Sequence, residues 1–252
     1  MDHSAHLPRK RRTRLGAVLV TLLATTALMT VVSAGTAAAC TTSPAPSPSG
    51  VPMGTAGGYA VLAGSTITNT GNSVITGDMG LSPGTSITGF PPGVNNGTMR
   101  TGSNAAAVQA KSDLTTAYNN AAARTPRTAI ATELGGKTLT AGNYSNGTFG
   151  LTGTLVLDGR GNSGSVFVFQ AASTLITASN STVTLINGAS ACNVFWQVGS
   201  SATLGTGTKF AGSVLALTSI TATTGVTVVG RLLARNGAVT LDTNTINKNS
   251  CT

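Results

Sequence analysis

The strongest constraint on the fold of this chain is a two-part sequence pattern that recurs four times in its last ninety residues. An apolar stretch comes first, a short threonine-bearing stretch follows it, and glycine or serine separates the copies. The apolar stretches are residues 166–169, 194–196, 214–217 and 232–234, and the threonine-bearing stretches are residues 176–180, 204–208, 220–224 and 239–243. A unit that repeats in this way predicts coils stacked into a solenoid, in which each coil buries its apolar face against its neighbours.

The coils are expected to differ in size. When Thr177, Gly205, Thr221 and Thr240 are taken as equivalent positions, the steps between them are 28, 16 and 19 residues. Residues 54–100 also show short strand patterns broken by glycine and proline, so this N-terminal part is predicted to add further coils of the same solenoid.

Between the strand-rich regions, residues 103–124 carry a helical pattern, because small and apolar residues recur at intervals of three and four. The residues of this pattern are Ala107, Ala110, Leu114, Ala117, Tyr118 and Ala121. Ser103 is the expected N-cap, Pro126 ends the segment, and a shorter helical turn is predicted over residues 126–134. The predicted fold is mainly β, an irregular β-solenoid with one long α-helix packed along it. The expected core includes Phe167, Phe169, Phe195, Trp196 and Leu215.

Residues 1–39 have the pattern of a secretory signal peptide. A basic cluster at 9–14 precedes an apolar stretch over 15–32, and three alanines end at position 39. The alternative is an uncleaved membrane anchor, because the apolar run over 15–39 is long enough to span a bilayer. With the signal removed, we expect a secreted protein without a membrane span.

Residues 40–53 form a Pro- and Ser-rich linker that is expected to bury nothing, so the folded domain is predicted to span residues 54–252. Three cysteines remain after the expected cleavage, in a chain bound for an oxidising compartment. Cys192 and Cys251 are the candidates for a disulfide that ties the C-terminal tail to the solenoid. Cys40 would be the first residue of the cleaved chain and is a candidate for lipidation or for pairing between chains.

The composition argues against catalysis. Both histidines, His3 and His6, leave with the signal, and with them the commonest general base and metal ligand. The acidic residues that remain are isolated along the chain: Asp78, Asp113, Glu133, Asp158 and Asp242. We therefore predict no catalytic residues, no metal site and no cofactor. After position 39 the chain holds ten basic and five acidic residues, a net charge of +5. The basic residues are scattered, and nucleic-acid binding would need them clustered.

The threonine-bearing stretches predict an ordered surface. Stacked strands lie about 4.8 Å apart and alternate residues along a strand about 6.7 Å apart, so outward threonines form a flat grid. Each threonine is β-branched and has few rotamers, which holds its hydroxyl and methyl groups in near-lattice order. The matching partner is a flat repetitive solid such as ice or a crystalline polysaccharide. The residues expected to contact it are Thr177, Ser179, Asn180, Thr206, Thr208, Thr221, Thr223, Thr224, Thr240 and Thr243.

At this level the chain resembles the microbial ice-binding proteins of the β-solenoid type, over essentially all of residues 54–251. The stretches that carry the resemblance are 59–71, 76–84, 164–170, 193–199 and 234–242. The resemblance implies a right-handed, discontinuous solenoid of triangular section, a helix along one face, and ice binding through another flat face. On that face the motif Thr-Ala/Gly-x-Thr/Asn recurs, and residues 177–180 and 221–224 match it. Residues 205–208 lack the first threonine, and residues 240–243 place Leu241 and Asp242 inside the motif.

The expected function is that of a secreted, non-catalytic, monomeric protein that adsorbs to ice and restrains its growth. The alternative is a cell-surface adhesion or structural module that binds polysaccharide or another cell through the same scaffold. One observation separates the two: if Lys209 and Asp242 both project into the threonine-bearing face, the adhesion hypothesis gains support.

Overall fold

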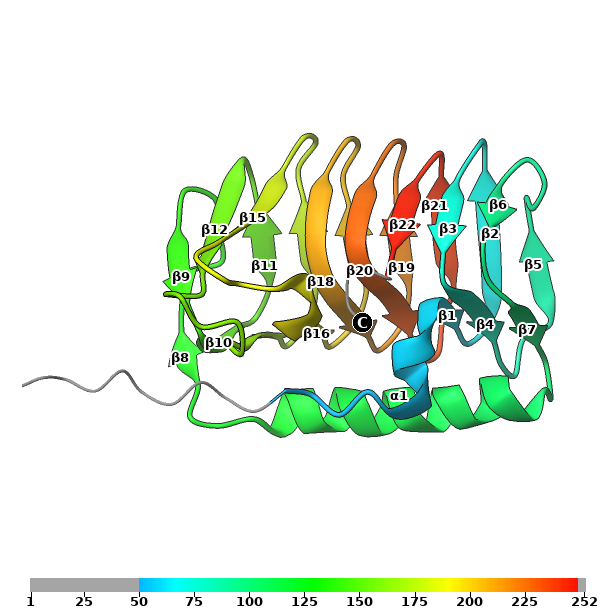
Figure 1. Cartoon of the computed structure of the whole chain (residues 1–252), viewed down its shortest axis with the longest axis horizontal. Helices are drawn as coiled ribbons and strands as arrows, with labels where there is room; N and C mark the ends of the chain where they lie inside the picture. The colour runs from blue at the N-terminus through cyan, green and yellow to red at the C-terminus, as the bar shows by residue number, and fades with distance from the viewer. Residues whose placement is uncertain (1–49, 249–252) are drawn as a thin grey trace, which may run out of the picture. The chain divides into compact units, whose positions relative to one another are not determined.

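The computed structural model describes residues 50–248, which wind into a stack of coils with one helix alongside (Figure 1). The predicted signal peptide, Cys40 and Cys251 lie outside the described residues. Val51, inside the predicted linker, is buried in the cluster beneath the helix, so the expectation that this linker buries nothing is wrong. Val51 is close to the apolar cluster beneath the helix, and moving its apolar surface out of water into that cluster is favourable.

One sheet of seven parallel strands forms the first face of the solenoid. In spatial order its strands are β11 (Phe149–Leu151), β14 (Leu175–Thr177), β17 (Ala202–Leu204), β19 (Ile220–Ala222), β21 (Val239–Asp242), β2 (Thr66–Thr70) and β5 (Ser86–Thr88). The early strand β2 therefore pairs with the late strand β21, which makes the solenoid discontinuous, as the family resemblance implied.

A second sheet of fifteen strands forms the other two faces. One row consists of β9 (Thr138–Thr140), β12 (Thr154–Asp158), β15 (Thr182–Ile186), β18 (Lys209–Ala216), β20 (Thr227–Ala234), β22 (Thr245–Asn247), β3 (Val74–Thr76) and β6 (Val94–Asn95). The other row consists of β8 (Thr128–Ala129), β10 (Gly142–Asn146), β13 (Phe167–Ala171), β16 (Val194–Val198), β18, β20, β1 (Tyr59–Ala63), β4 (Asp78–Leu81) and β7 (Met99–Thr101). Two short 3-10 turns, Gly54–Gly58 and Ala191–Asn193, complete the described elements.

The long strands β18 and β20 belong to both rows because they bend at Gly212 and Gly230. Both glycines have positive φ, 111° and 144°. A Cβ on Gly230 would lie 2.0 Å from the Gly212 carbonyl oxygen, so only glycine fits where these two backbones cross the corner.

Helix α1 (Ala105–Ala123) explains how the chain can leave the stack and rejoin it. Its 19 residues rise about 1.5 Å each and cover about 28 Å, close to six strand spacings of about 4.8 Å. The helix thus returns the chain from the β5–β7 end of the stack to the β8–β11 end (Figure 1). The remaining coils then stack back until β22 meets β3, where Thr245 pairs with Val74.

The predicted helix is confirmed, and the residues of its expected apolar face are all buried. Asn104, not Ser103, is the N-cap, and its side chain accepts hydrogen bonds from the amides of Ala106 and Ala107. The helical turn predicted over residues 126–134 is wrong. This segment instead holds β8, in which Thr128 pairs with Tyr144 of β10, because an unpaired sheet edge offers the backbone more hydrogen bonds than one isolated turn.

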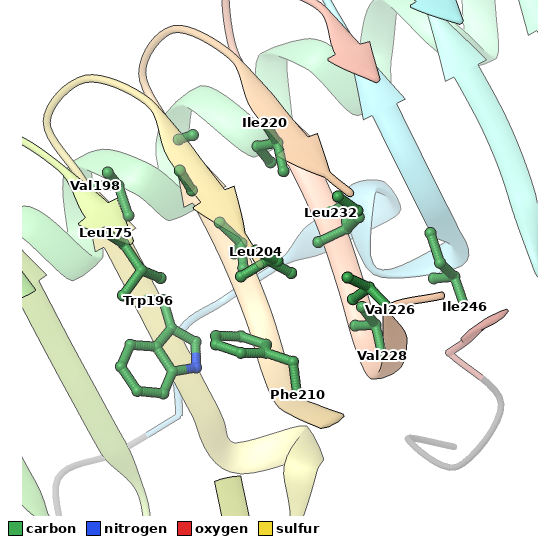
Figure 2. Close-up of a cluster of buried hydrophobic side chains, with 14 of the residues drawn as sticks. Leu175, Trp196, Val198, Leu204, Phe210, Ile220, Val226, Val228, Leu232 and Ile246 are labelled. Carbon is green, nitrogen blue, oxygen red and sulfur yellow. The ribbon is translucent and has the colours of Figure 1, made fainter. Parts of the chain in front are cut away.

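The expected core residues are buried, but they divide between two layers. Phe167, Phe169 and Trp196 fill the inside of the solenoid, where the Phe169 and Trp196 rings stack at 4.0 Å between centroids. Figure 2 shows Trp196 beside Phe210, with aliphatic side chains continuing the stack towards Ile246. Phe195 and Leu215 point the other way and pack against the helix.

Hydrogen bonds from polar side chains to backbone carbonyl oxygens, in both directions, hold the helix against the sheet. The Gln170 side-chain amide donates to the carbonyl oxygens of Ala121 and Arg124, which lie at the helix C-terminus. Lys111 of the helix donates from Nζ to the carbonyl oxygens of Ala234 and Arg235. Burial, together with the nearby Arg235 guanidinium, lowers the pKa of Lys111 to about 8.

This shift gives a pH-dependent stability with a defined sign. The folded protein releases the Lys111 proton near pH 8, whereas the unfolded chain holds it to about pH 10.5. Between these values the unfolded state binds more protons, so stability rises with pH. We expect the wild type to gain about 1–3 kcal/mol of unfolding free energy relative to Lys111→Met across this range. Urea denaturation of both proteins at several pH values would measure it, and a constant difference would contradict the assignment.

Candidate functional site

Two of the three solenoid faces are free of the helix, because α1 packs on the β16 and β13 row. The seven-stranded sheet is one of the two, and we call its outward surface the threonine face. Its side chains alternate between the surface and the interior, as at Thr221, whose neighbours Ile220 and Ala222 are both buried. The central row in register consists of Ile176, Thr203, Thr221, Thr240, Thr68 and Thr88.

Small residues, most of them polar, flank the central row on both sides. On one side lie Ser201, Ser219, Ala238, Thr66 and Ser86, and on the other Ala178, Gly205, Thr223, Asp242 and Thr70. Thr223 donates its hydroxyl to the Leu204 carbonyl oxygen at 2.9 Å and lies 3.3 Å, oxygen to oxygen, from the hydroxyl of Thr206. These contacts between neighbouring coils hold the hydroxyls in fixed positions.

The threonine face carries almost no charge. None of its seven strands contains lysine or arginine, and Asp242 is their one acidic residue. The Asp242 carboxylate accepts hydrogen bonds from the hydroxyls of Thr224 at 2.5 Å and Thr243 at 3.0 Å. Lys209 lies on the neighbouring face, paired with Thr182 and Thr227. Since only one of the two charged residues reaches the threonine face, the condition that would favour adhesion is not met.

The structure corrects the placement of Thr177 and Thr208. Their side chains are 3% and 0% exposed, and their hydroxyls share a hydrogen bond of 2.9 Å inside the solenoid. Thr203 pairs with Ile176 on one side and with Thr221 on the other, so residues 177–180 are shifted by one residue relative to 221–224. In a strand, a shift of one residue turns each side chain to the opposite face. Thr177 is therefore not equivalent to Thr221, and the two buried threonines cannot contact a solid outside.

The other predicted contact residues are at the surface. Thr221, Thr223 and Thr240 lie on the threonine face, and Thr240 is the most exposed of the three. The remaining five lie in equivalent turns of successive coils, where the chain leaves the seven-stranded sheet after β14, β17, β19 or β21. They are Ser179, Asn180, Thr206, Thr224 and Thr243. Their contact with a ligand stays a prediction.

Five threonines of this face escaped the sequence analysis: Thr203, Thr66, Thr68, Thr70 and Thr88. Thr203 was missed because the repeats were aligned on threonines. Alignment on the buried anchors Leu175, Ala202, Ile220 and Val239, which pair in register, would have found it. The other four belong to N-terminal coils, and no local pattern places these beside the C-terminal coil.

The turn beside the threonine face contains one strained residue. Asn180, Gly207, Gly225 and Gly71 occupy this turn with positive φ, and Thr243 does the same with φ of 54°. Threonine adopts this conformation at a cost of about 1–3 kcal/mol, whereas asparagine tolerates it.

We expect Thr243→Asn to raise the free energy of unfolding by about 1 kcal/mol. Guanidinium denaturation would measure the change. Thr227→Asn is the control, because Thr227 is an exposed strand residue on the neighbouring face and should gain nothing. Equal effects of the two substitutions would show that backbone strain at Thr243 is not the cause.

The predicted disulfide remains a prediction, because Cys192 lies in the turn Ala191–Asn193 whereas Cys251 is outside the described residues. Within residues 50–248, no group of three or more His, Cys, Asp or Glu side chains is placed to hold a metal ion. In the same range, no helix is both long enough and apolar enough to cross a membrane.

Comparison with known proteins relates this chain and its fold to one family. A profile described as ice-binding-like matches residues 61–247. An ice-binding protein of Nostoc sp. (strain HG1) is 55% identical over 202 residues, a match that covers 79% of this chain and 74% of that protein. The crystal structure of an ice binding protein from an Antarctic biological consortium superposes with a TM-score of 0.78 at 50% identity, covering 80% of this chain and 92% of the other. An ice-binding protein from the ascomycete Antarctomyces psychrotrophicus gives a TM-score of 0.76 at 46% identity, covering 79% and 98%.

Proposed function

Because the chain belongs to the ice-binding-like family, we propose that it binds ice through the threonine face and restrains the growth of ice crystals. One observation carries the proposal. Five threonines stand in register on five consecutive strands of a free face: Thr203, Thr221, Thr240, Thr68 and Thr88.

The geometry suits an ordered solid. Rows about 4.8 Å apart and residues about 6.7 Å apart along each strand form a two-dimensional lattice of hydroxyl and methyl groups. Lysine and arginine side chains, which would order the adjacent water differently, are absent from these strands. Water held over such a grid can merge with the ice surface, and the adsorbed protein then pins the growing front.

Adsorption needs no catalytic residue, and the acidic residues elsewhere are engaged in structural contacts. Asp78 pairs with Arg100 at 2.5 Å. Hydrogen bonds from Thr55 lower the pKa of Asp113. The backbone amide of Arg160 and the side chain of Asn187 lower the pKa of Asp158. Glu133 accepts from the amides of Gly135 and Thr152. Each of these carboxylates therefore has a structural partner, which supports a non-catalytic protein. Secretion, directed by a signal peptide over residues 1–39, is part of the same proposal.

The proposal is tested by ice-recrystallisation inhibition with Thr240→Tyr, which places a bulky ring in the middle of the central row. The inhibitory concentration should rise at least about tenfold, equal to the loss of about 1.4 kcal/mol of adsorption energy. Thr227→Tyr is the matched control, because Thr227 is an exposed strand threonine on the neighbouring free face.

Three outcomes separate the hypotheses. A loss confined to Thr240→Tyr supports the threonine face, and a loss confined to Thr227→Tyr would move the ice contact to the neighbouring face. If the folded wild type leaves crystal growth unchanged, ice is not the ligand, and adhesion to polysaccharide or to a cell becomes the leading hypothesis.

A further inference from the structure

The carboxylate of Asp242 lies at the edge of the threonine face and joins two successive coils. Its Oδ2 accepts a hydrogen bond from the Thr224 hydroxyl at 2.5 Å, and its Oδ1 accepts one from the Thr243 hydroxyl at 3.0 Å. Thr224 lies in the turn after β19 and Thr243 in the turn after β21, and both side chains are exposed. One carboxylate therefore controls two surface hydroxyls that come from different coils.

The backbone of Asp242 is fixed from inside the solenoid. Its amide donates to Asn244 Oδ1 at 2.8 Å, and its carbonyl oxygen accepts from the Gly225 amide at 3.0 Å. Asn244 is 1% exposed, and its Nδ2 donates to the Thr223 carbonyl oxygen at 2.7 Å. The Asn244 amide donates to the hydroxyl of the buried Ser73 at 2.8 Å. This buried network sets the position from which the carboxylate reaches the surface.

The chemistry of a carboxylate decides the direction of both hydroxyl groups. A carboxylate accepts hydrogen bonds and donates none, whereas a threonine hydroxyl that is free to rotate can do either. The hydroxyl hydrogens of Thr224 and Thr243 therefore point at Asp242, and the oxygen lone pairs of these hydroxyls remain for water. Hydrogen bonds to a charged acceptor are roughly twice as strong as those between neutral groups, which favours this orientation at the surface.

The same hydrogen bonds explain how a charge can belong to a face made of hydroxyl and methyl groups. A charged side chain normally opposes contact with a solid, because its hydration has to be removed or rearranged. Both oxygens of Asp242 already accept a threonine hydroxyl from the same surface, so less of their hydration is left to rearrange. Hydroxyls that are ordered before contact also lower the entropy cost of adsorption.

We propose that Asp242 is a positioning residue of the ice contact, which holds the Thr224 and Thr243 hydroxyls in the direction in which they meet the ordered water of the ice surface. The inference rests on the proposed ice binding through the threonine face. It extends the contact from the strands to the turns beside them, and Asp242 acts through its two threonine partners.

Asp242→Asn tests the direction of the hydroxyls at nearly constant side-chain size. The new Nδ2 donates, so the threonine hydroxyl that faces it has to turn its hydrogen away. We expect the inhibitory concentration in ice-recrystallisation inhibition to rise about three- to tenfold, the loss of about one hydrogen bond in the contact. Asp113→Asn is the matched control, because it removes the same charge from helix α1 and should leave the inhibitory concentration unchanged.

A double-mutant cycle tests whether Asp242 acts through Thr224. Asp242→Ala removes the acceptor, and Thr224→Val removes the hydroxyl and keeps its shape. The two losses of inhibition should combine to less than their product, because the two groups share one hydrogen bond. Thr203→Val is the control partner. Its strand β17 lies two strands from β21, so its loss and that of Asp242→Ala should multiply. Thermal unfolding of each variant checks that it is folded.

Two results would overturn the inference: inhibition by folded Asp242→Asn that equals or exceeds that of the wild type, and losses that multiply for Asp242→Ala with Thr224→Val. Either result leaves the proposed function standing as long as the wild type restrains crystal growth and Thr240→Tyr does not. A folded wild type that leaves crystal growth unchanged would instead overturn the proposed function, and this inference with it.

Discussion

Trp196→Ala is expected to lower the free energy of unfolding by about 3–5 kcal/mol, the cost of removing a large buried aromatic side chain. The Trp196 side chain is fully enclosed at the centre of the solenoid. Its ring stacks on Phe169 with 4.0 Å between centroids and tilts against Phe210 at 5.1 Å. Its Nε1 donates to the Ala211 carbonyl oxygen at 3.0 Å. The substitution would leave a cavity between coils and an unpaired carbonyl at the bend of β18.

Chemical denaturation would measure this change, with Met99→Ala as the control. Met99 is a large apolar residue of the terminal strand β7 and is substantially exposed. Its truncation should change the stability by less than about 0.5 kcal/mol. A loss below about 1 kcal/mol for Trp196→Ala would contradict the central place of this ring in the core.

Thr177→Tyr is expected to destabilise the protein by about 3 kcal/mol or more, because it overfills the core and breaks buried hydrogen bonds. The Thr177 hydroxyl accepts from the Gly205 amide at 2.8 Å and shares a hydrogen bond with the Thr208 hydroxyl. Both partners are left without their bond when a phenol ring replaces the hydroxyl. The effect would confirm that this threonine belongs to the interior of the solenoid.

The preceding residue provides the matched control. Ile176 is 53% exposed and occupies the end of the central row of the threonine face. Ile176→Tyr should therefore change the stability by less than about 0.5 kcal/mol. The same ring on two consecutive residues thus tests the register directly. Equal destabilisation by both substitutions would place the strand in a different phase from the one described.

The helix and the solenoid class could be predicted because their signals are local. The three-and-four spacing from Ala107 to Ala121 depends only on helical geometry, and each of its members is buried. The apolar stretches are also a local signal, and they were predicted to form core strands. Trp196 and Phe169, which belong to these stretches, lie in the core inside the solenoid. Where a local signal was weak, as over residues 126–134, the prediction of a helical turn was wrong because an open sheet edge captured the backbone.

The sequence by itself determined that the chain forms a β-solenoid with one helix, and that its threonine-bearing stretches lack basic residues. Only the tertiary structure decided which threonines share a face. Thr240 pairs with Thr68 although most of the chain lies between them, and Thr177 turns inward although it begins a matching motif. The physical reason is that hydrogen bonds between neighbouring coils set the register, and a change of one residue in register reverses the direction of a side chain.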